Sequence, residues 1–293
     1  VPVVLDLRLL RKNVGLYTRE PNNQLAFFGA ARYFLAVRDY ASAEKLAKAA
    51  LRDHPQWASP NFVMAKVVDV QFEDLQCIEY YKLALKASPN WLDASIACAD
   101  KLNTCEQFSQ SVAVSTAALK FAEGQPKTAE LEIYLGTLRY CKAQALYNLK
   151  DFRGAASVLE ADSAQKLNSV RLKFLVGCYV HCKEWPKALA ISNRLVQSYP
   201  SDFSYRLQRA QVYAGLNQPQ NAIADLTQCL QLKKYTIKNT GLGALAVLEE
   251  REVRMLRASM YAKLGMKELA QRDRAAIKEA TDRAYKEAVF RSK

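Results

Sequence analysis

Residues 207–234 read LQRAQVYAGLNQPQNAIADLTQCLQLKK, and this stretch decides the fold. It carries two small residues, Ala210 and Ala222, twelve positions apart. Two antiparallel helices that are joined by a short turn approach each other most closely where their side chains are small. The stretch therefore predicts a helix–turn–helix pair in which Ala210 and Ala222 mark the crossing of the two helices.

The same spacing recurs along the chain in both directions from this stretch. The small residues twelve apart are Ala31/Ala43, Ala65/Cys77, Ala99/Ser111, Ala143/Ala155, Val176/Ala188, Ala210/Ala222 and Ala258/Ala270. Their first members are separated by 34, 34, 44, 33, 34 and 48 residues. Four of these intervals fit one repeat, and the other two fit a repeat with an insertion. A fixed period of this length is typical of stacked helical repeats.

This spacing resembles the tetratricopeptide repeat, most clearly over residues 207–234 and over residues 256–277, LRASMYAKLGMKELAQRDRAAI. The resemblance covers roughly residues 24–280. It implies an all-α fold, a right-handed α-solenoid of stacked helix–turn–helix units. It also implies a concave groove that is lined by the first helix of each pair. The resemblance predicts architecture well, but such scaffolds bind many unrelated partners.

We expect a single solenoid over residues 1–293, with about seven helix pairs and insertions near residues 123–130 and 235–248. The second insertion could be a loop or a short extra helix. Residues 1–21 fit the second helix of a truncated preceding repeat, so we expect that the chain begins inside a longer solenoid. Residues 268–290 alternate charged and apolar side chains, which is typical of a C-terminal capping helix.

Composition supports an all-helical chain. The 293 residues include 43 Ala but only 10 Gly and 9 Pro, which favours helix over turns. No apolar stretch approaches the roughly 18 residues that a membrane span needs. The seven Cys are odd in number and irregularly spaced, which argues against a disulfide framework. We expect reduced thiols in an intracellular, reducing compartment such as the cytoplasm or nucleus, with an organelle left open.

No catalytic or metal-binding pattern is assembled in the sequence. Two His residues are too few for a three-His metal site. Cys178, His181 and Cys182, with Cys141 from a neighbouring repeat, could hold zinc, but they fit a helix interface better because no second Cys or His pair completes the set. The Asp and Glu residues are scattered along the chain as on a solvent-exposed helix surface, and no pair of them suggests a catalytic acid and base. We therefore expect a protein that is not an enzyme and that has no cofactor and no metal site.

The groove is the candidate binding site, for a protein or peptide partner. In the first helix of each pair, the residues that face the groove are expected three positions before, one position after and four positions after the small residue. We expect partner contacts at Phe28, Arg32, Leu35, Phe62, Lys66, Asp69, Tyr140, Gln144, Tyr147 and Gln211. Large apolar residues at such places are as often buried between helices as exposed to a partner, and this applies to Phe28 and Phe62. The favoured function is a non-catalytic interaction scaffold, a subunit or adaptor of a multiprotein assembly.

The alternative function is RNA binding. The net charge is +13, which favours anionic partners. A candidate basic surface near the C-terminus comprises Lys233, Lys234, Lys238, Arg251, Arg254 and Arg257. Such residues could dock on RNA phosphates, or they could form a solvated helix face. No regular set of base-reading side chains follows the repeat, so RNA binding stays the second hypothesis.

Overall fold

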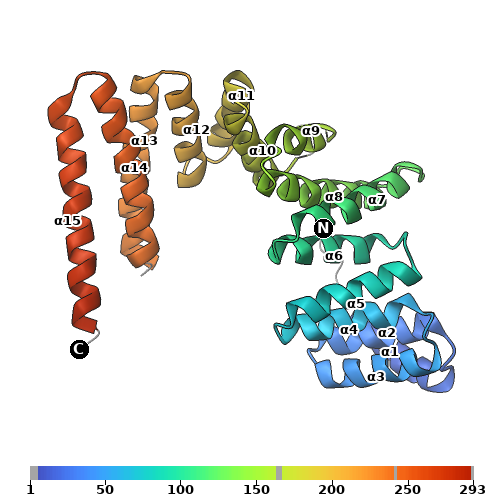
Figure 1. The fold of residues 1–293 in the computed structure, drawn as a ribbon. Coiled ribbons are helices and arrows are strands. Elements are labelled where there is room, and N and C mark those ends of the chain that lie inside the picture. The colour runs from blue at the N-terminus through green and yellow to red at the C-terminus, as the bar shows by residue number, and fades with distance from the viewer. Residues whose placement is uncertain (1–5, 163–166, 241–242, 292–293) are drawn as a thin grey trace. The chain divides into compact units, whose positions relative to one another are not determined.

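The protein is described by a computed structural model. It gives the backbone of residues 6–162, 167–240 and 243–291, and the side chains of these ranges except 233–240, 243–249 and 283–291. Over these residues it contains fifteen α-helices and no strand (Figure 1). The helices are α1 (Leu7–Arg19), α2 (Gln24–Ala36), α3 (Tyr40–Asp53), α4 (Ala58–Val70), α5 (Asp74–Ala87), α6 (Leu92–Thr104), α7 (Phe108–Glu123), α8 (Ala129–Asn148), α9 (Phe152–Glu160), α10 (Ser169–His181), α11 (Trp185–Ser198), α12 (Phe203–Gly215), α13 (Pro219–Thr240), α14 (Gly243–Lys263) and α15 (Lys267–Arg291).

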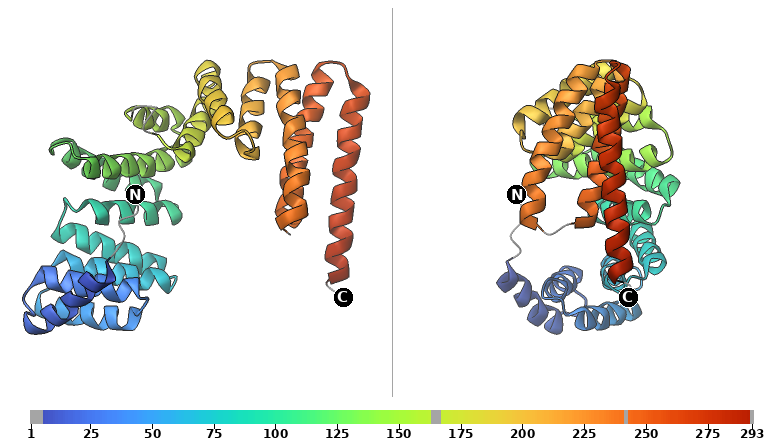
Figure 2. Two further views of the ribbon diagram at one scale, coloured as in Figure 1. Left: turned by 180° about the vertical axis from the view of Figure 1, so that it is seen from behind. Right: turned by 90° about the vertical axis from the view of Figure 1, so that its left-hand side faces the viewer.

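The helices gather into two compact units, Val1–Val158 and Leu159–Lys293. After α1, consecutive helices form pairs of the expected helix–turn–helix kind, and the two turned views show the antiparallel course of the pairs within each unit (Figure 2). The predicted all-α fold of stacked helix pairs is confirmed.

The two insertions lengthen the repeat in different ways. Residues 124–128 connect α7 to α8, and Thr128 caps α8 by accepting a hydrogen bond at Oγ1 from the backbone N–H of Leu131, 3.1 Å away. The described residues of the second insertion, 235–240 and 243–248, form neither a loop nor a separate short helix, because α13 continues to Thr240 and α14 begins at Gly243. These residues therefore extend two existing helices, which reach 22 and 21 residues.

The small residues lie where the helices of a pair cross. All fourteen are buried, with at most 3% of any of them exposed. In the third pair the contact is polar as well, because the Ser111 hydroxyl donates a hydrogen bond to the carbonyl oxygen of Ala99, 3.0 Å away. A larger side chain at these positions has no room, so the twelve-residue spacing directly sets the packing of each pair.

One turn geometry joins the two helices of every pair. Seven positions after the first small residue the backbone takes a positive φ of 56–74°, at Arg38, Phe72, Glu106, Lys150, Lys183, Asn217 and Gly265. The next backbone N–H then bonds back to the first helix, as from Asp39 to the carbonyl of Phe34 at 2.9 Å. This left-handed residue satisfies carbonyls at the helix end and reverses the chain within a few residues.

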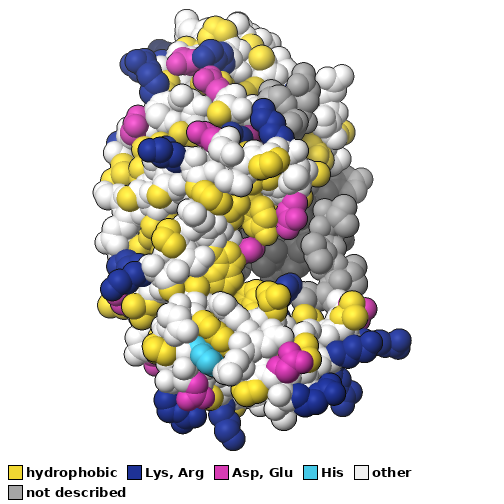
Figure 3. All heavy atoms as spheres, turned by 90° about the vertical axis from the view of Figure 1, so that its right-hand side faces the viewer, with side chains coloured by type: hydrophobic (Ala, Val, Ile, Leu, Met, Phe, Trp, Pro, Cys, Tyr) yellow, Lys and Arg dark blue, Asp and Glu magenta, His cyan; other side chains and the backbone are white. Residues whose placement is uncertain are grey.

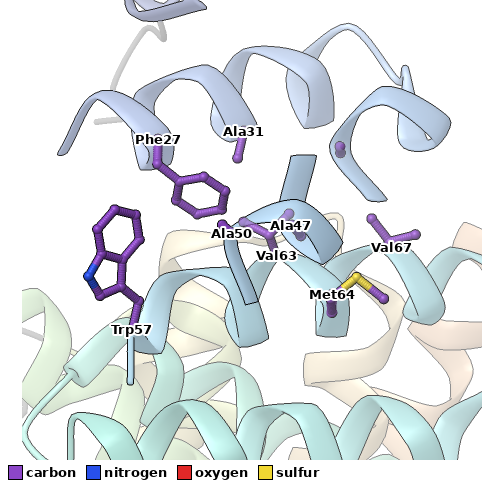
Figure 4. Packing of buried hydrophobic residues seen from close by; sticks show 9 residues of the cluster. Phe27, Ala31, Ala47, Ala50, Trp57, Val63, Met64 and Val67 are labelled. Carbon is purple, nitrogen blue, oxygen red and sulfur yellow. The ribbon is translucent and has the colours of Figure 1, made fainter. Parts of the chain in front are cut away.

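The core runs between successive pairs. In the first unit, Phe27 and Ala31 of α2 pack on Ala47 and Ala50 of α3 and on Val63, Met64 and Val67 of α4, with Trp57 at the edge (Figure 4). The Phe27 and Trp57 rings are 6.0 Å apart. Within the first unit, the core clusters join each helix pair to the next.

Candidate functional groove

The first helices of the first unit carry an aromatic cluster. The ring of Trp91, which precedes α6, lies 5.4 Å from Phe28 of α2 and 4.7 Å from Phe62 of α4. Phe62 also lies 5.8 Å from the buried ring of Tyr81. Phe28 and Phe62 are only partly exposed and pack against core clusters. These two predicted groove residues therefore join adjacent repeats and leave only part of each ring to a partner.

Two cations lie over this cluster. The guanidinium of Arg32 is 5.9 Å from the centre of the Phe28 ring, and the ammonium of Lys66 is 5.6 Å from that of Phe62. Contact with an aromatic face positions a cation without neutralising its charge. Within the described part of the chain, neither cation forms an ion pair with a carboxylate. They occupy equivalent positions, 34 residues apart, on consecutive first helices.

The remaining predicted groove residues of the first unit have mixed roles. Leu35 is half-buried against the core. Asp69 forms an ion pair with Lys101 of α6 at 2.6 Å, and Asp74 binds the same ammonium at 2.5 Å. Partial burial lowers the pKa of Lys101, but the hydrogen bonds that its ammonium donates to the two carboxylates outweigh this effect and raise that pKa above its usual value.

The predicted groove residues of α8 are Tyr140, Gln144 and Tyr147, each of intermediate exposure. The Tyr147 ring makes an edge contact with Phe152, 5.0 Å away. These three side chains follow one helix face at intervals of four and three residues, as a contact row would require.

In the second unit, the predicted groove residue Gln211 is tied to the next first helix. Its side-chain amide donates a hydrogen bond to Glu252 of α14, 3.1 Å away. A shallow cavity of about 510 Å³ adjoins this contact, lined by Gln211, Arg251, Glu252, Met255, Leu256 and Ser259. Figure 3 shows one face of the molecule, on which hydrophobic, basic and acidic side chains are mixed over the surface.

Comparison with known proteins fits this architecture. The tetratricopeptide repeat (TPR) family model matches residues 175–240. The C-terminal part of a TPR protein from Cytophaga hutchinsonii aligns over 87% of this chain and 98% of its own length, with 15% identity and a TM-score of 0.66. Residues 175–240 thus match the tetratricopeptide repeat family, and the chain has the TPR helical-repeat fold.

Two further TPR structures share its fold. One, from Parabacteroides merdae, covers 91% of this chain and 95% of its own, at 18% identity and a TM-score of 0.54. The other is YrrB, described as having an unusual peptide-binding site, which covers 64% of this chain and 91% of its own at 16% identity and a TM-score of 0.53. No curated protein sequence was found to match. TPR proteins are generally non-catalytic and serve as protein-interaction scaffolds.

The basic surface of this TPR chain differs from the row of exposed cations expected from the sequence. Arg251 is exposed, but Arg254 and Arg257 point onto Asp273 of α15, which is 3% exposed. A buried carboxylate is stabilised by cationic partners. These two guanidinium groups therefore neutralise Asp273 and are not simply exposed surface charges. The side chains of Lys233, Lys234 and Lys238 lie outside the described residues.

This arrangement, which we name the arginine clamp, occurs twice among the residues that the structure describes. In the α12/α13 pair, Arg209 and Arg206 bind Asp225, which is 4% exposed; in the α14/α15 pair, Arg257 and Arg254 bind Asp273. The two clamps are displaced from each other by the same 48 residues as the pairs themselves. The signal in the sequence is the repeated Arg-x-x-Arg with an Asp sixteen positions after its second Arg, and net charge alone does not reveal it.

The described residues contain no group of three or more side chains of the metal-binding types. None of the seven cysteines, all within the described residues, forms a disulfide bond, and five of them are buried. No described helix is both long and apolar enough to cross a membrane.

Proposed function

We propose that this TPR protein is a non-catalytic scaffold that binds an acidic segment of a partner protein along the first helices of its first unit, as a subunit or adaptor of a larger assembly. The observation that carries the proposal is the pair Arg32 and Lys66. Each lies on an aromatic ring, and neither is neutralised by a carboxylate within the described residues.

The physical reason favours a carboxylate-bearing peptide. A cation held against an aromatic face has lost part of its side-chain freedom before binding, so less entropy is lost when an anion arrives. Partly exposed rings of Phe28 and Phe62 beside it can accept apolar side chains of the same segment. A few such anchors supply most of the affinity of a peptide interface.

Gln144 and Tyr147 extend the proposed contact row along α8. Amide and phenol groups of this kind can bond to the backbone of a bound segment, as well as to its side chains. The peptide-binding site described for YrrB supports the idea that this fold accommodates such ligands, although the two chains share only the fold.

The experiment is affinity purification of the full chain from its native cells, followed by identification of co-purifying proteins. The test variant carries Ala at Arg32, Lys66, Gln144 and Tyr147. The matched control replaces Lys45 and Lys86, which are exposed on the second helices α3 and α5, with Ala. We expect the test variant to lose a partner that the wild type and the control both retain. If all three proteins recovered every partner equally, the proposal that the groove binds the partner would be wrong.

A direct measurement follows once a partner is known. Charge reversal by Arg32→Glu together with Lys66→Glu is expected to weaken binding by about 100-fold, or about 3 kcal/mol, because two favourable charge contacts become repulsive. The control Lys45→Glu with Lys86→Glu makes the same change in net charge and is expected to leave the affinity within about threefold.

A further inference from the structure

The turn between α4 and α5 differs from the other turns of its kind. Among the described residues, six of the seven left-handed turn positions carry a polar or charged side chain or glycine: Arg38, Glu106, Lys150, Lys183, Asn217 and Gly265. The α4/α5 turn instead carries Phe72, at a φ of 61°. A positive φ is unusual for a bulky side chain, and Gly or Asn adopts it more readily. The geometry of the turn therefore does not account for an aromatic residue at this position.

The fold also gives the Phe72 ring nothing to pack on. The side chain is 90% exposed, the highest value among the large apolar residues that the structure describes. Leu75, in the first turn of α5, is 70% exposed, and Val70, at the end of α4, is 46% exposed. We name these three residues the Phe72 knob. Clustered apolar side chains that remain in solvent are typical of surfaces that bind another molecule.

The next helix pair holds the knob in place. Asp69 before the turn and Asp74 after it both bind the ammonium of Lys101 of α6, at 2.6 Å and 2.5 Å, and the Lys101 side chain is only 15% exposed. The backbone N–H groups of Phe72 and Glu73 donate hydrogen bonds back to carbonyl groups of α4, at 3.3 Å and 3.2 Å. The segment is thus fixed at both ends, and a surface that is fixed before binding loses less entropy when a partner arrives.

The surroundings of the knob are acidic, although the chain carries a net charge of +13. Asp69, Glu73 and Asp74 flank the ring in the sequence, and the ammonium of Lys101 offsets one of their three charges. Within the described residues, the exposed Glu73 forms no ion pair. The preceding turn carries one charge of each sign and the following turn one more carboxylate, from Arg38, Asp39 and Glu106. A cationic surface has the complementary charge.

We propose that the Phe72 knob docks into an apolar pocket of another protein whose rim carries Lys or Arg side chains. Phe72 fills the pocket, Val70 and Leu75 cover its edge, and the carboxylate of Glu73 meets a cation of the rim. A single buried aromatic anchor of this kind supplies much of the affinity of an interface. The knob lies on a turn, outside the predicted groove positions, and the proposal does not depend on the function proposed above.

Charge disfavours two other occupants. Two copies of this chain that met knob to knob would bring Glu73 against Glu73, and like charges across an interface are repulsive. A lipid surface with anionic headgroups would repel the same carboxylates. A pocket that is both apolar and rimmed by cations satisfies the ring and the acidic flank together.

The first test places the photoreactive p-benzoylphenylalanine at position 72 of the full chain, which is irradiated in a lysate of its native cells. The matched control carries the same group at Lys150, an exposed position in an equivalent turn. We expect a protein product at position 72 that the control lacks and that Glu73→Lys reduces by about tenfold. Mass mapping should place the attachment among apolar residues that have Lys or Arg beside them.

The second test uses that purified partner and separates binding from folding. Phe72→Asn introduces the residue type found at Asn217, and it should weaken binding by about 30-fold. The same change should raise the melting temperature of the isolated chain by about 1–3 °C, because it relieves the backbone at the positive φ. Phe72→Tyr, which keeps the ring, and the control Lys150→Asn should each bind within about threefold of the wild type.

Four results would overturn the proposal. They are attachment at a polar or acidic surface, a product that joins two copies of this chain or joins the chain to a lipid, no product beyond the control, and unchanged affinity in Phe72→Asn. A fall in the melting temperature of Phe72→Asn would also count against it, since the ring would then stabilise the isolated fold.

Discussion

Arg257 binds the buried carboxylate of Asp273 through two parallel hydrogen bonds, 2.8 Å from Nε to Oδ2 and 2.7 Å from Nη2 to Oδ1. Arg209 holds Asp225 in the same way, at 2.7 Å and 2.7 Å. This bidentate geometry is the strong form of the Arg–carboxylate contact. Because each Arg lies on the first helix of its pair and each Asp on the second, the contact fixes the register of the two helices.

Removing one partner of a clamp should be costly. Asp273→Ala leaves the guanidinium of Arg257, 14% exposed, without its carboxylate, and leaves that of Arg254, 22% exposed, with Glu250 alone. We expect the free energy of unfolding to fall by about 2–4 kcal/mol. The control is Asp282→Ala, an exposed site on the same helix, which should change stability by less than about 0.5 kcal/mol. Urea denaturation followed by circular dichroism measures both; a similar, small effect in the two variants would contradict the role of the clamp.

Two glycines should respond to alanine in opposite directions. Gly265 has a φ of +74°, so Gly265→Ala is expected to destabilise the chain by about 1 kcal/mol. Gly177 lies inside α10, and an added Cβ there meets no atom within 4 Å, so Gly177→Ala is expected to stabilise by up to about 1 kcal/mol. Thermal denaturation of both variants is the measurement. If both variants changed the melting temperature in the same direction, backbone conformation would not be what decides the effect of these substitutions.

The small positions should reject larger side chains. Ala210 is 0% exposed at the crossing of α12 and α13. Ala210→Leu is expected to destabilise by about 2 kcal/mol or more, because a packed crossing must open. Ala190→Leu, at an exposed site of α11, is the matched control and should be near neutral. If the melting temperatures of the two variants agreed, close approach at Ala210 would not limit the packing.

Stability should depend on Glu160 at acid pH. The Tyr179 hydroxyl donates a hydrogen bond to its carboxylate at 2.5 Å, and this bond is the largest cause that lowers the pKa of Glu160 below its usual value; Lys187 adds to it. A lowered native pKa contributes stability above the unfolded value of 4.5, and that stability is lost as pH falls through the native pKa.

Tyr179→Phe should therefore lower stability at pH 7 more than at pH 3. The Glu160 side chain is 42% exposed and partly screened by solvent, so the pH-dependent difference is expected to be about 1 kcal/mol or less. Urea titrations at several pH values measure it. A loss of equal size at both pH values would assign the effect of Tyr179 to packing.

The thiols should fall into two reactivity classes. Burial raises the pKa of Cys98, Cys178 and Cys229 to about 12 each, which keeps them protonated and unreactive. Cys105 and Cys182 are only partly buried. With a thiol reagent and mass mapping, we expect these two to react at least about 100-fold faster, since the buried thiols must wait for local opening. Fast modification of Cys178 in the native protein would contradict this packing.

The sequence by itself determined the repeat. Ala210 and Ala222, and the six equivalent pairs, specify where helices cross because only small side chains permit close approach, and that information is local. Helical periodicity also assigns residues such as Arg32 and Lys66 to one face of the first helices, and the resemblance to the repeat family predicts that this face lines a groove.

Only the tertiary structure decided which polar side chains remain available to a partner. Arg251, Arg254 and Arg257 look alike in the sequence, yet two of them are directed onto Asp273, sixteen or more residues away. Asp69 and Gln211 are likewise bound to Lys101 and Glu252 of the next first helix. Whether a charged side chain faces solvent or a buried counter-charge depends on a neighbour that comes close only when the chain folds. Helical periodicity relates residues of one helix, so it does not predict that neighbour.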